Sequence, residues 1–326
     1  MIDPQALSGV LEPVLGTVRI ADLRVLTGGA SRATWAFTAD DRPLILRTGP
    51  PDEVHAGMEL EAAALRRAAA SGAPVPGVLA ASNSVEPLGN PYLVCDFIAG
   101  ETIVRKIART LDGTSRAALL AQCAQALAQI HRADPQGIGL PVSDPLTDWR
   151  HELDDMGDTT ATFEYAFRWL EKRRPAPTAP VLAHGDFRMG NLIVADGSLA
   201  AVLDWELTHI GEAADDLAWF CIRAWRFGAP RDLGAGGLGS IEDFVTAYEN
   251  AGGAAIDRAA LHWWLVLATL RWGVICRYQY ERHRSGQTRS VELAAIGRRV
   301  CETEYDLLTL LEGSAGLEPS DSGSSA

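Results

Sequence analysis

The sequence predicts an α+β protein with two lobes, a small one built on an antiparallel sheet and a larger, mainly helical one. The first hundred or so residues alternate short apolar runs with turns, which is typical of strands. Beyond them, apolar residues mostly recur at helical spacing. A short stretch that ends at Gly100 separates the two patterns. We expect the small lobe at residues 1–97, the large lobe at 98–312 and a disordered, Gly- and Ser-rich tail at 313–326.

The small lobe is expected to be a strand meander followed by a helix. Its strands are predicted at residues 18–26, 33–38, 43–47 and 92–97. The first two are separated by the glycine-containing turn at residues 27–31. A helix is predicted at residues 58–70, because no proline or glycine interrupts its apolar positions.

The large lobe is expected to hold helices around one compact strand–loop–strand passage at residues 181–205. The helices are predicted at residues 118–131, 149–172, 213–224, 241–251, 258–278 and 291–311. Residues 261–276 are the most apolar stretch, but they are too few to span a bilayer and include His262 and Arg271. A buried core helix is therefore expected there.

Composition limits the classes of function. The net charge of -13 argues against general binding of nucleic acids and against docking on anionic membranes. Five scattered cysteines without a C-x-x-C pair fit buried thiols in a reducing compartment. The first residues lack the basic start and apolar run of a signal peptide, so we expect a cytoplasmic protein. We expect it to be a monomer or a homodimer.

The most informative segment contains the motifs HGDFRMGN and LDWE. Two apolar strands joined by an Asp-Gly turn at residues 196–197 would form a hairpin that returns Asp204 to the side of Asn191. Phosphoryl transfer to a hydroxyl needs a carboxylate that accepts the hydroxyl proton and oxygen ligands that place magnesium against the phosphates. The segment therefore predicts Asp186 as the base, with Asn191 and Asp204 sharing a metal ion.

These motifs resemble those of the aminoglycoside phosphotransferase and choline kinase family, relatives of the protein kinases, over roughly residues 20–310. The resemblance implies a bilobal, protein-kinase-like fold with ATP (or GTP) in the cleft between the lobes. It implies Asp186 as catalytic base and Asn191 and Asp204 as Mg2+ ligands. Arg188 stands where protein kinases carry a lysine near the transferred phosphoryl group. A salt bridge to a neighbouring carboxylate is the structural alternative for Arg188.

The resemblance also implies contacts between the small lobe and the nucleotide. Gly29 and Ser31 lie in the turn where the loop covering the phosphates belongs, although such a turn is also a common hairpin tip. The backbone carbonyl of Asp96 and the amide of Ile98 would contact adenine.

Arg47 stands in the place of the kinase lysine that pairs with the α- and β-phosphates. Arginine keeps the charge and can bind phosphate with two parallel hydrogen bonds. Glu61 matches the glutamate that orients this cation, and Glu59 is its near rival. The alternative for Arg47 is a solvated arginine at a strand end.

Three further polar residues, His131, His184 and Asp216, are expected to be structural, the last two by holding the catalytic loop. Several tryptophans in the last helices should be mostly core, with one or two lining the pocket for the phosphoryl acceptor. Arginines among them would bind an anionic acceptor or form ion pairs inside the lobe; they are Arg223, Arg271 and Arg277.

The chain resembles most the branch of this family found in domains associated with acyl-CoA dehydrogenases. The likeness lies in the arginine-ended strand, the DFRMGN loop, the segment RAWRFG and a later WG pair. It suggests a small-molecule acceptor that carries a hydroxyl, such as a hydroxy acid or a hydroxyacyl thioester. The alternatives are an aminoglycoside or choline-type kinase, and a nucleotide-binding pseudokinase without turnover.

Overall fold

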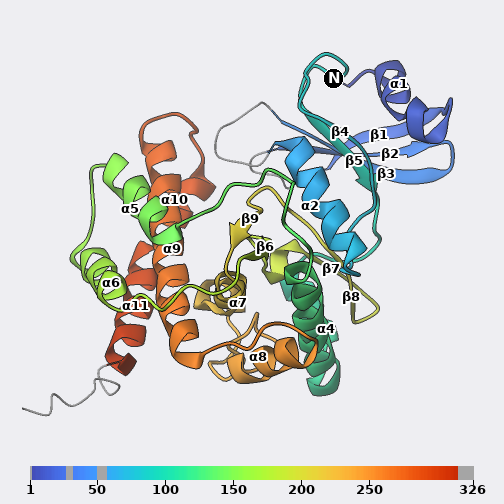
Figure 1. The fold of residues 1–326 in the computed structure, drawn as a ribbon. Coiled ribbons are helices and arrows are strands. Elements are labelled where there is room, and N and C mark those ends of the chain that lie inside the picture. Colours follow the sequence, from blue (N-terminus) through green and yellow to red (C-terminus); the bar gives the residue numbers. More distant parts are fainter. Residues whose placement is uncertain (1, 27–31, 50–56, 315–326) are drawn as a thin grey trace, which may run out of the picture.

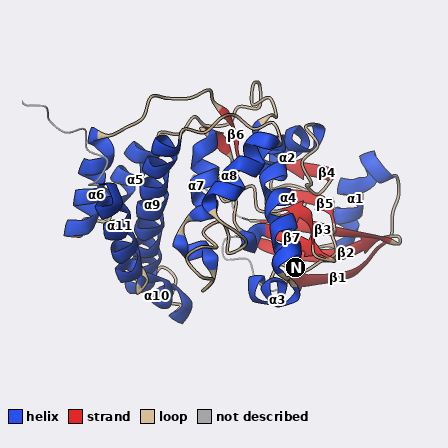
Figure 2. Ribbon diagram, turned by 90° about the horizontal axis from the view of Figure 1, so that it is seen from below, coloured by secondary structure: helices blue, strands red, loops and turns tan. Residues whose placement is uncertain are grey.

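The computed structural model describes residues 2–26, 32–49 and 57–314. A sheet with two helices forms one end of the molecule, and the remaining helices form the other (Figure 1). Viewed along a perpendicular direction, the sheet again lies apart from helices α5, α6, α9, α10 and α11 (Figure 2). The predicted fold, a small antiparallel sheet followed by a helical lobe, is therefore confirmed. The lobe boundary at residue 97 stays a prediction.

The sheet of the small lobe is antiparallel throughout, with strand order β1-β2-β3-β5-β4. Its strands are Ile20–Leu26 (β1), Ala33–Ala39 (β2), Arg42–Thr48 (β3), Val78–Ser82 (β4) and Tyr92–Asp96 (β5). In β3, Leu44 and Leu46 are fully buried on one face, and Ile45 and Arg47 alternate onto the other. The alternation therefore directs Arg47 away from the Leu44 face of the sheet.

Two helices accompany the sheet. Helix α1, Pro4–Leu15, was not predicted; it begins at Asp3, whose side chain accepts a hydrogen bond from the Gln5 amide (3.0 Å), and it buries Leu7 and Leu11 in the core beside β3. Helix α2, Met58–Ala70, has the predicted bounds and buries the side chain of Glu61. A buried carboxylate needs an ion-pair or hydrogen-bond partner, and Arg32 and Arg47 provide ion pairs for Glu61.

The helices of the large lobe surround a shared apolar core. They are Val104–Thr110 (α3), Gly113–His131 (α4), Pro145–Asp155 (α5), Ala161–Lys172 (α6), Ala213–Cys221 (α7), Ile241–Asn250 (α8), Arg258–Arg284 (α9), Val291–Gly297 (α10) and Val300–Ser314 (α11). The single helix predicted at 149–172 is wrong. Gly157 takes a left-handed conformation (φ 67°), and Thr160 then caps α6 by accepting from the Phe163 amide.

The C-terminal prediction also needs correction. The stretch 291–311 is two helices, α10 and α11, and α11 continues to Ser314, two residues into the predicted tail. Residues 315–326 lie outside the described part of the chain.

Two properties of the core bear on the sequence predictions. Helix α9 is long and apolar enough to cross a membrane, and 72% of its most apolar window is buried within the fold. Four cysteines are buried thiols as predicted, whereas Cys301 is exposed on α11. Burial raises the pKa of Cys123 and of Cys221 to about 12.

The predicted hairpin is confirmed. Strand β7, Leu192–Ala195, pairs antiparallel with β8, Ser198–Val202, through a turn in which Asp196 and Gly197 are both left-handed. A second short pair is formed by β6, Val181–Ala183, and β9, His209–Gly211. The linker packs on this hairpin, because Glu101 and Val194 exchange two backbone hydrogen bonds (2.9 and 3.0 Å). The loop between β6 and β7 carries Asp186.

Candidate active site

A buried histidine supports the loop that carries Asp186. The His184 ring is fully buried, and its Nε2 lies 2.9 Å from the Leu203 carbonyl oxygen. A carbonyl only accepts, so Nε2 carries the proton and Nδ1 accepts the Asp186 amide hydrogen (3.1 Å). Burial lowers the pKa of His184 and keeps the ring neutral. His184 therefore has the structural role that the sequence indicated.

A buried carboxylate, Asp216 on α7, holds the same loop from the other side. Its two oxygens accept the backbone hydrogens of His184 (2.7 Å) and Gly185 (2.8 Å), and His131 of α4 approaches within 3.1 Å. Burial would raise the pKa of Asp216, but the hydrogen bond and charge of His131, with the hydrogen bonds from the loop, hold it well below its ordinary value. The carboxylate is therefore ionised and ties α4, α7 and the loop together.

We expect Asp216→Ala to destabilise the protein. It leaves two buried backbone donors without an acceptor, and each such loss costs about 1–3 kcal/mol. The depressed pKa gives a contribution that is fully present above the ordinary carboxyl range and is lost as the pH falls through the lower folded value. Urea denaturation at pH 7 should show a loss of about 3 kcal/mol or more, against less than about 0.5 kcal/mol for the exposed Asp155→Ala. Equal midpoints for the two variants would contradict this role.

The carboxylate of Asp186 is held by three side chains. Asn191 Nδ2 donates to its Oδ2 (2.7 Å), Trp219 Nε1 donates to its Oδ1 (2.7 Å), and Arg188 Nε lies 3.0 and 3.1 Å from the two oxygens. The side chain is 13% exposed, so it is fixed but still partly accessible to solvent. The sequence did not indicate the contact with Trp219.

Arg188 forms the salt bridge that was its structural alternative. Its guanidinium pairs with Asp186 and lies over the ring of Trp225, 4.9 Å from the ring centroid. It therefore stands beside the predicted base, where positive charge can also reach a transferred phosphoryl group. Its catalytic role stays a prediction.

The two predicted metal ligands meet at the open end of the hairpin. The Leu203 amide donates to the Asn191 carbonyl (2.8 Å), which brings Asp204 beside Asn191. Asn191 uses Nδ2 for Asp186, and no described residue donates to its Oδ1. Asp204, in a left-handed conformation (φ 66°), has 32% of its side chain exposed. An amide oxygen and a carboxylate are ligands that suit Mg2+, although the described residues contain no cluster of three acidic, histidine or cysteine side chains.

Arg47 is not a solvated arginine. It forms ion pairs with the fully buried Glu61 and with Asp204, whose Oδ1 lies 2.7 Å from its NH2 group. Burial would lower the pKa of Arg47, but the carboxylates of Glu61, Asp204 and Glu206 outweigh this and raise it. The arginine therefore links β3 and α2 to Asp204, which follows the β7–β8 hairpin.

Glu61, not Glu59, is the partner of Arg47. Glu59 is exposed and accepts from the Asn83 amide (3.1 Å). Glu61 also pairs with the buried Arg32, which the sequence did not single out. Glu206, likewise missed, lies 3.6 Å from both arginines.

The remaining nucleotide residues are placed in part. Gly29 and Ser31 lie outside the described residues. The Asp96 amide donates to Gly77 (3.0 Å) as β5 ends, and the side chain of Asp96 pairs with Arg42. The Ile98 amide has no hydrogen-bond partner among the described residues, so it remains available to an adenine ring.

The arginines proposed for the acceptor pocket form ion pairs inside the lobe. Arg223 pairs with Asp306 (2.6 Å), Arg277 pairs with Asp158, and Arg271 lies 3.7 Å from Asp215. The ion-pair alternative thus describes all three residues.

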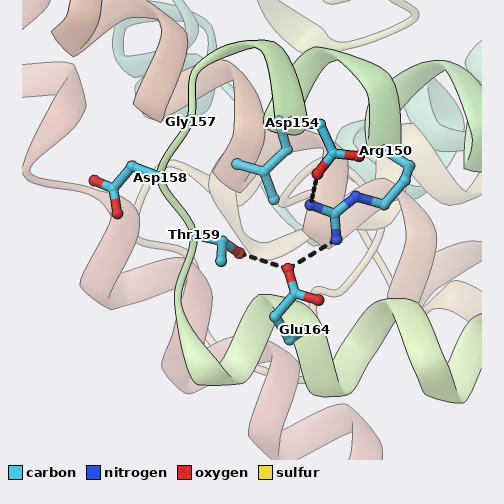
Figure 3. Close-up of a pocket in the computed structure, with 7 residues that line it drawn as sticks. Arg150, Asp154, Gly157, Asp158, Thr159 and Glu164 are labelled. Atoms are coloured by element: carbon cyan, nitrogen blue, oxygen red, sulfur yellow. Dashed lines mark hydrogen bonds and ion pairs between the residues drawn. The ribbon is translucent and has the colours of Figure 1, made fainter.

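A polar pocket lies between α5 and α6 (Figure 3). Arg150 bridges Asp154 and Glu164 across it, and Thr159 also donates to Glu164. None of the predicted catalytic, nucleotide or metal residues lines this pocket. Arg150, Asp154, Thr159 and Glu164 are paired with one another, and Asp158 pairs with Arg277, so we assign this pocket no role in phosphoryl transfer.

Fold and site together define a two-lobed phosphotransferase. A profile of the phosphotransferase enzyme family matches residues 22–264. The chain belongs to this family, which confirms the predicted family and the predicted enzyme class.

Curated relatives include acyl-CoA dehydrogenase family member 10 of Mus musculus, 26% identical over 94% of this chain and 31% of the relative. Acyl-CoA dehydrogenase family member 11 of Homo sapiens is 24% identical over 93% of this chain and 42% of the relative. The chain thus spans about a third of the length of the first of these. The hygromycin-B 4-O-kinase of Escherichia coli is 25% identical over 63% of this chain and 64% of the relative.

Solved structures share the fold. A protein from Ralstonia eutropha described as an aminoglycoside phosphotransferase superposes with a TM-score of 0.79 at 20% identity, over 96% of this chain and 99% of that one. A spectinomycin phosphotransferase in complex with ADP and spectinomycin superposes with a TM-score of 0.66 at 15% identity, over 95% and 99%. These similarities confirm the kinase-like architecture.

Proposed function

We propose that this protein transfers the γ-phosphoryl group of MgATP to a hydroxyl of a small molecule. The observation that carries the proposal is the convergence of Asp186, Asn191, Asp204 and Arg47 at one end of the β7–β8 hairpin. Asn191 bonds Asp186 and Arg47 bonds Asp204 (each 2.7 Å), and the Leu203 amide next to Asp204 bonds the Asn191 carbonyl (2.8 Å). A base, two oxygen ligands and a phosphate-pairing cation are the parts that phosphoryl transfer requires.

Each residue has a distinct role in this proposal. The carboxylate of Asp186 accepts the proton of the acceptor hydroxyl, which leaves the oxygen free to attack the γ-phosphorus. Asn191 and Asp204 would hold the magnesium ion, which neutralises charge on the phosphates. Arg47 pairs with the phosphates, and Glu61 fixes its position. The backbone at the end of β5 (Asp96) and just beyond it (Ile98) binds the base of the nucleotide, which is ATP or GTP.

For the acceptor we propose a hydroxy acid or a hydroxyacyl thioester. Two relatives that match over more than nine tenths of this chain are named as acyl-CoA dehydrogenase family members. Beside Asp186 the large lobe presents tryptophans, with ring centroids 5.3 Å apart for Trp219 and Trp225 and 4.7 Å apart for Trp225 and Trp272. Trp219 and Trp225 are buried, so the half-buried Trp272 is the ring of this cluster that offers apolar surface to an acyl chain, whereas an aminoglycoside needs carboxylates for its amino groups.

A screen for phosphoryl acceptors tests this choice. We expect ADP release above the acceptor-free rate with hydroxy acids or hydroxyacyl-CoA thioesters. Choline, sugars, hygromycin B and spectinomycin should give no increase under the same conditions. Parallel assays of the Asp186→Asn variant with each compound identify ADP release by contaminating ATPases. Robust turnover of an aminoglycoside or choline, with none for the acid and acyl compounds, would disprove the acceptor class and leave the phosphotransferase standing.

A further inference from the structure

We infer that Trp219 is a positioning residue for phosphoryl transfer: its indole N–H holds the carboxylate of Asp186 in the orientation that accepts the hydroxyl proton. The inference rests on the proposed function, in which Asp186 is the base. Trp219 lies on α7, is 2% exposed, and places Nε1 2.7 Å from Asp186 Oδ1. An indole only donates and a carboxylate only accepts, so the direction of this hydrogen bond is fixed.

Two donors on two different oxygens determine the plane of the carboxylate. Asn191 holds Oδ2 and Trp219 holds Oδ1, each at 2.7 Å. With either donor alone, the carboxylate could turn about its Cβ–Cγ bond. Arg188 does not distinguish the two oxygens of Asp186, because its Nε is almost equidistant from them. Trp219 therefore supplies the second point that sets which lone pair faces the acceptor.

The indole is itself held against the catalytic loop. The Arg271 guanidinium of α9 lies 4.3 Å from the Trp219 ring centroid, and its NH2 group donates to the Gly185 carbonyl (2.7 Å). Position 185 has no room for a side chain, because its backbone has φ 82° and a Cβ there would lie 2.2 Å from the Leu207 carbonyl oxygen. Arg271 thus joins the indole and the residue before Asp186 into one rigid unit.

Orientation matters because the transfer step moves a proton and a phosphoryl group together. The acceptor O–H proton passes to the Asp186 carboxylate, the acceptor oxygen bonds to the γ-phosphorus, and the bond to the β–γ bridging oxygen breaks to release ADP. Trp219 keeps its own proton. A base must lie within about 2.6–3.2 Å of the oxygen that it deprotonates, and a misplacement of about 1 Å costs on the order of 10²-fold.

The first test is Trp219→Phe, which keeps an aromatic ring under Arg271 and removes the N–H. We expect kcat to fall by about 10-fold to 10²-fold while KM for ATP stays within about 2-fold, since no nucleotide contact changes. The matched control is Trp263→Phe, which deletes a buried indole hydrogen bond to the Leu170 carbonyl (2.9 Å) in the same lobe and should leave kcat unchanged. An unchanged kcat in Trp219→Phe, or equal losses in both variants, would overturn the inference.

A second replacement guards against misfolding of the phenylalanine variant. Benzothienylalanine at position 219 has a sulfur where the indole has N–H and fills nearly the same volume. It should reproduce the loss of kcat, and wild-type kcat with this side chain would overturn the inference.

A double-mutant cycle separates positioning from general loosening. If Trp219 acts through Asp186, Trp219→Phe should add less than about 2-fold in single-turnover transfer to the loss caused by Asp186→Ala. The same fold loss in both backgrounds would show that Trp219 acts elsewhere. Failure of the proposed function is distinct: near-wild-type turnover by Asp186→Ala itself would remove the base assignment, and the inference with it.

Discussion

Asp186→Asn should reduce kcat by about 10²–10⁴-fold, the usual contribution of a general base. The amide keeps the size of the carboxylate but cannot accept the hydroxyl proton. Nucleotide binding should persist, because the contacts between Arg47 and Glu61 and the backbone after β5 do not involve Asp186. Steady-state turnover of the best acceptor from the screen, together with ATP-induced thermal shifts, measures both quantities.

Asp216→Asn cannot serve as the control for Asp186→Asn, because Asp216 holds the same catalytic loop. Asp155→Asn, an exposed substitution at the end of α5, serves instead and should retain full turnover. An Asp186→Asn enzyme that keeps more than about a tenth of wild-type turnover would exclude Asp186 as the base.

Asp204→Asn should abolish the magnesium-dependent part of nucleotide binding. Asparagine tolerates the left-handed backbone at this position, so the fold should survive. The loss of a charged ligand should reduce kcat by about 10²–10³-fold, because metal stabilisation of the transition state is worth several kcal/mol. In thermal-shift experiments, ATP with magnesium should stabilise the wild type by several degrees more than ATP alone, and this increment should vanish in the variant.

Asp196→Asn is the matched control for this experiment. It changes the same residue type, also left-handed (φ 50°), in the turn of the same hairpin, and it should behave as the wild type. Equal magnesium-dependent shifts for Asp204→Asn and Asp196→Asn would show that Asp204 does not bind the metal.

Local patterns were sufficient to predict much of the fold. Strand β3 and helix α2 were expected from alternation and helical spacing, and the Asp-Gly turn predicted the β7–β8 hairpin. Strand β4 was missed because its small residues, VLAAS, give neither alternation nor bulk. The break between α5 and α6 was missed because only the left-handed backbone of Gly157, not the apolar spacing around it, marks it.

The site was predictable where residues lie near one another in the sequence, as in the pair Asp186 and Asn191. The contacts that tertiary packing makes were not. Trp219 lies 33 residues from Asp186, and nothing in its spacing separates it from the core tryptophans around it. Arg32 and Glu61 lie far apart in the sequence, so only the packing of α2 against the sheet shows their ion pair.

The anchor of the Gly185 carbonyl has a consequence for synthesis. Arg271, which supplies it, follows 86 residues later in the chain. When the ribosome has added the last residue of the predicted catalytic set, Asp204, the Gly185 carbonyl does not yet have the donor of the complete fold. Burying this carbonyl without that donor would cost about 1–3 kcal/mol. A fragment that stops at residue 264, where the family match ends, would contain the whole catalytic loop and still lack the arginine that fixes it. The loop therefore reaches its final geometry only after the middle of α9 has been translated and has docked.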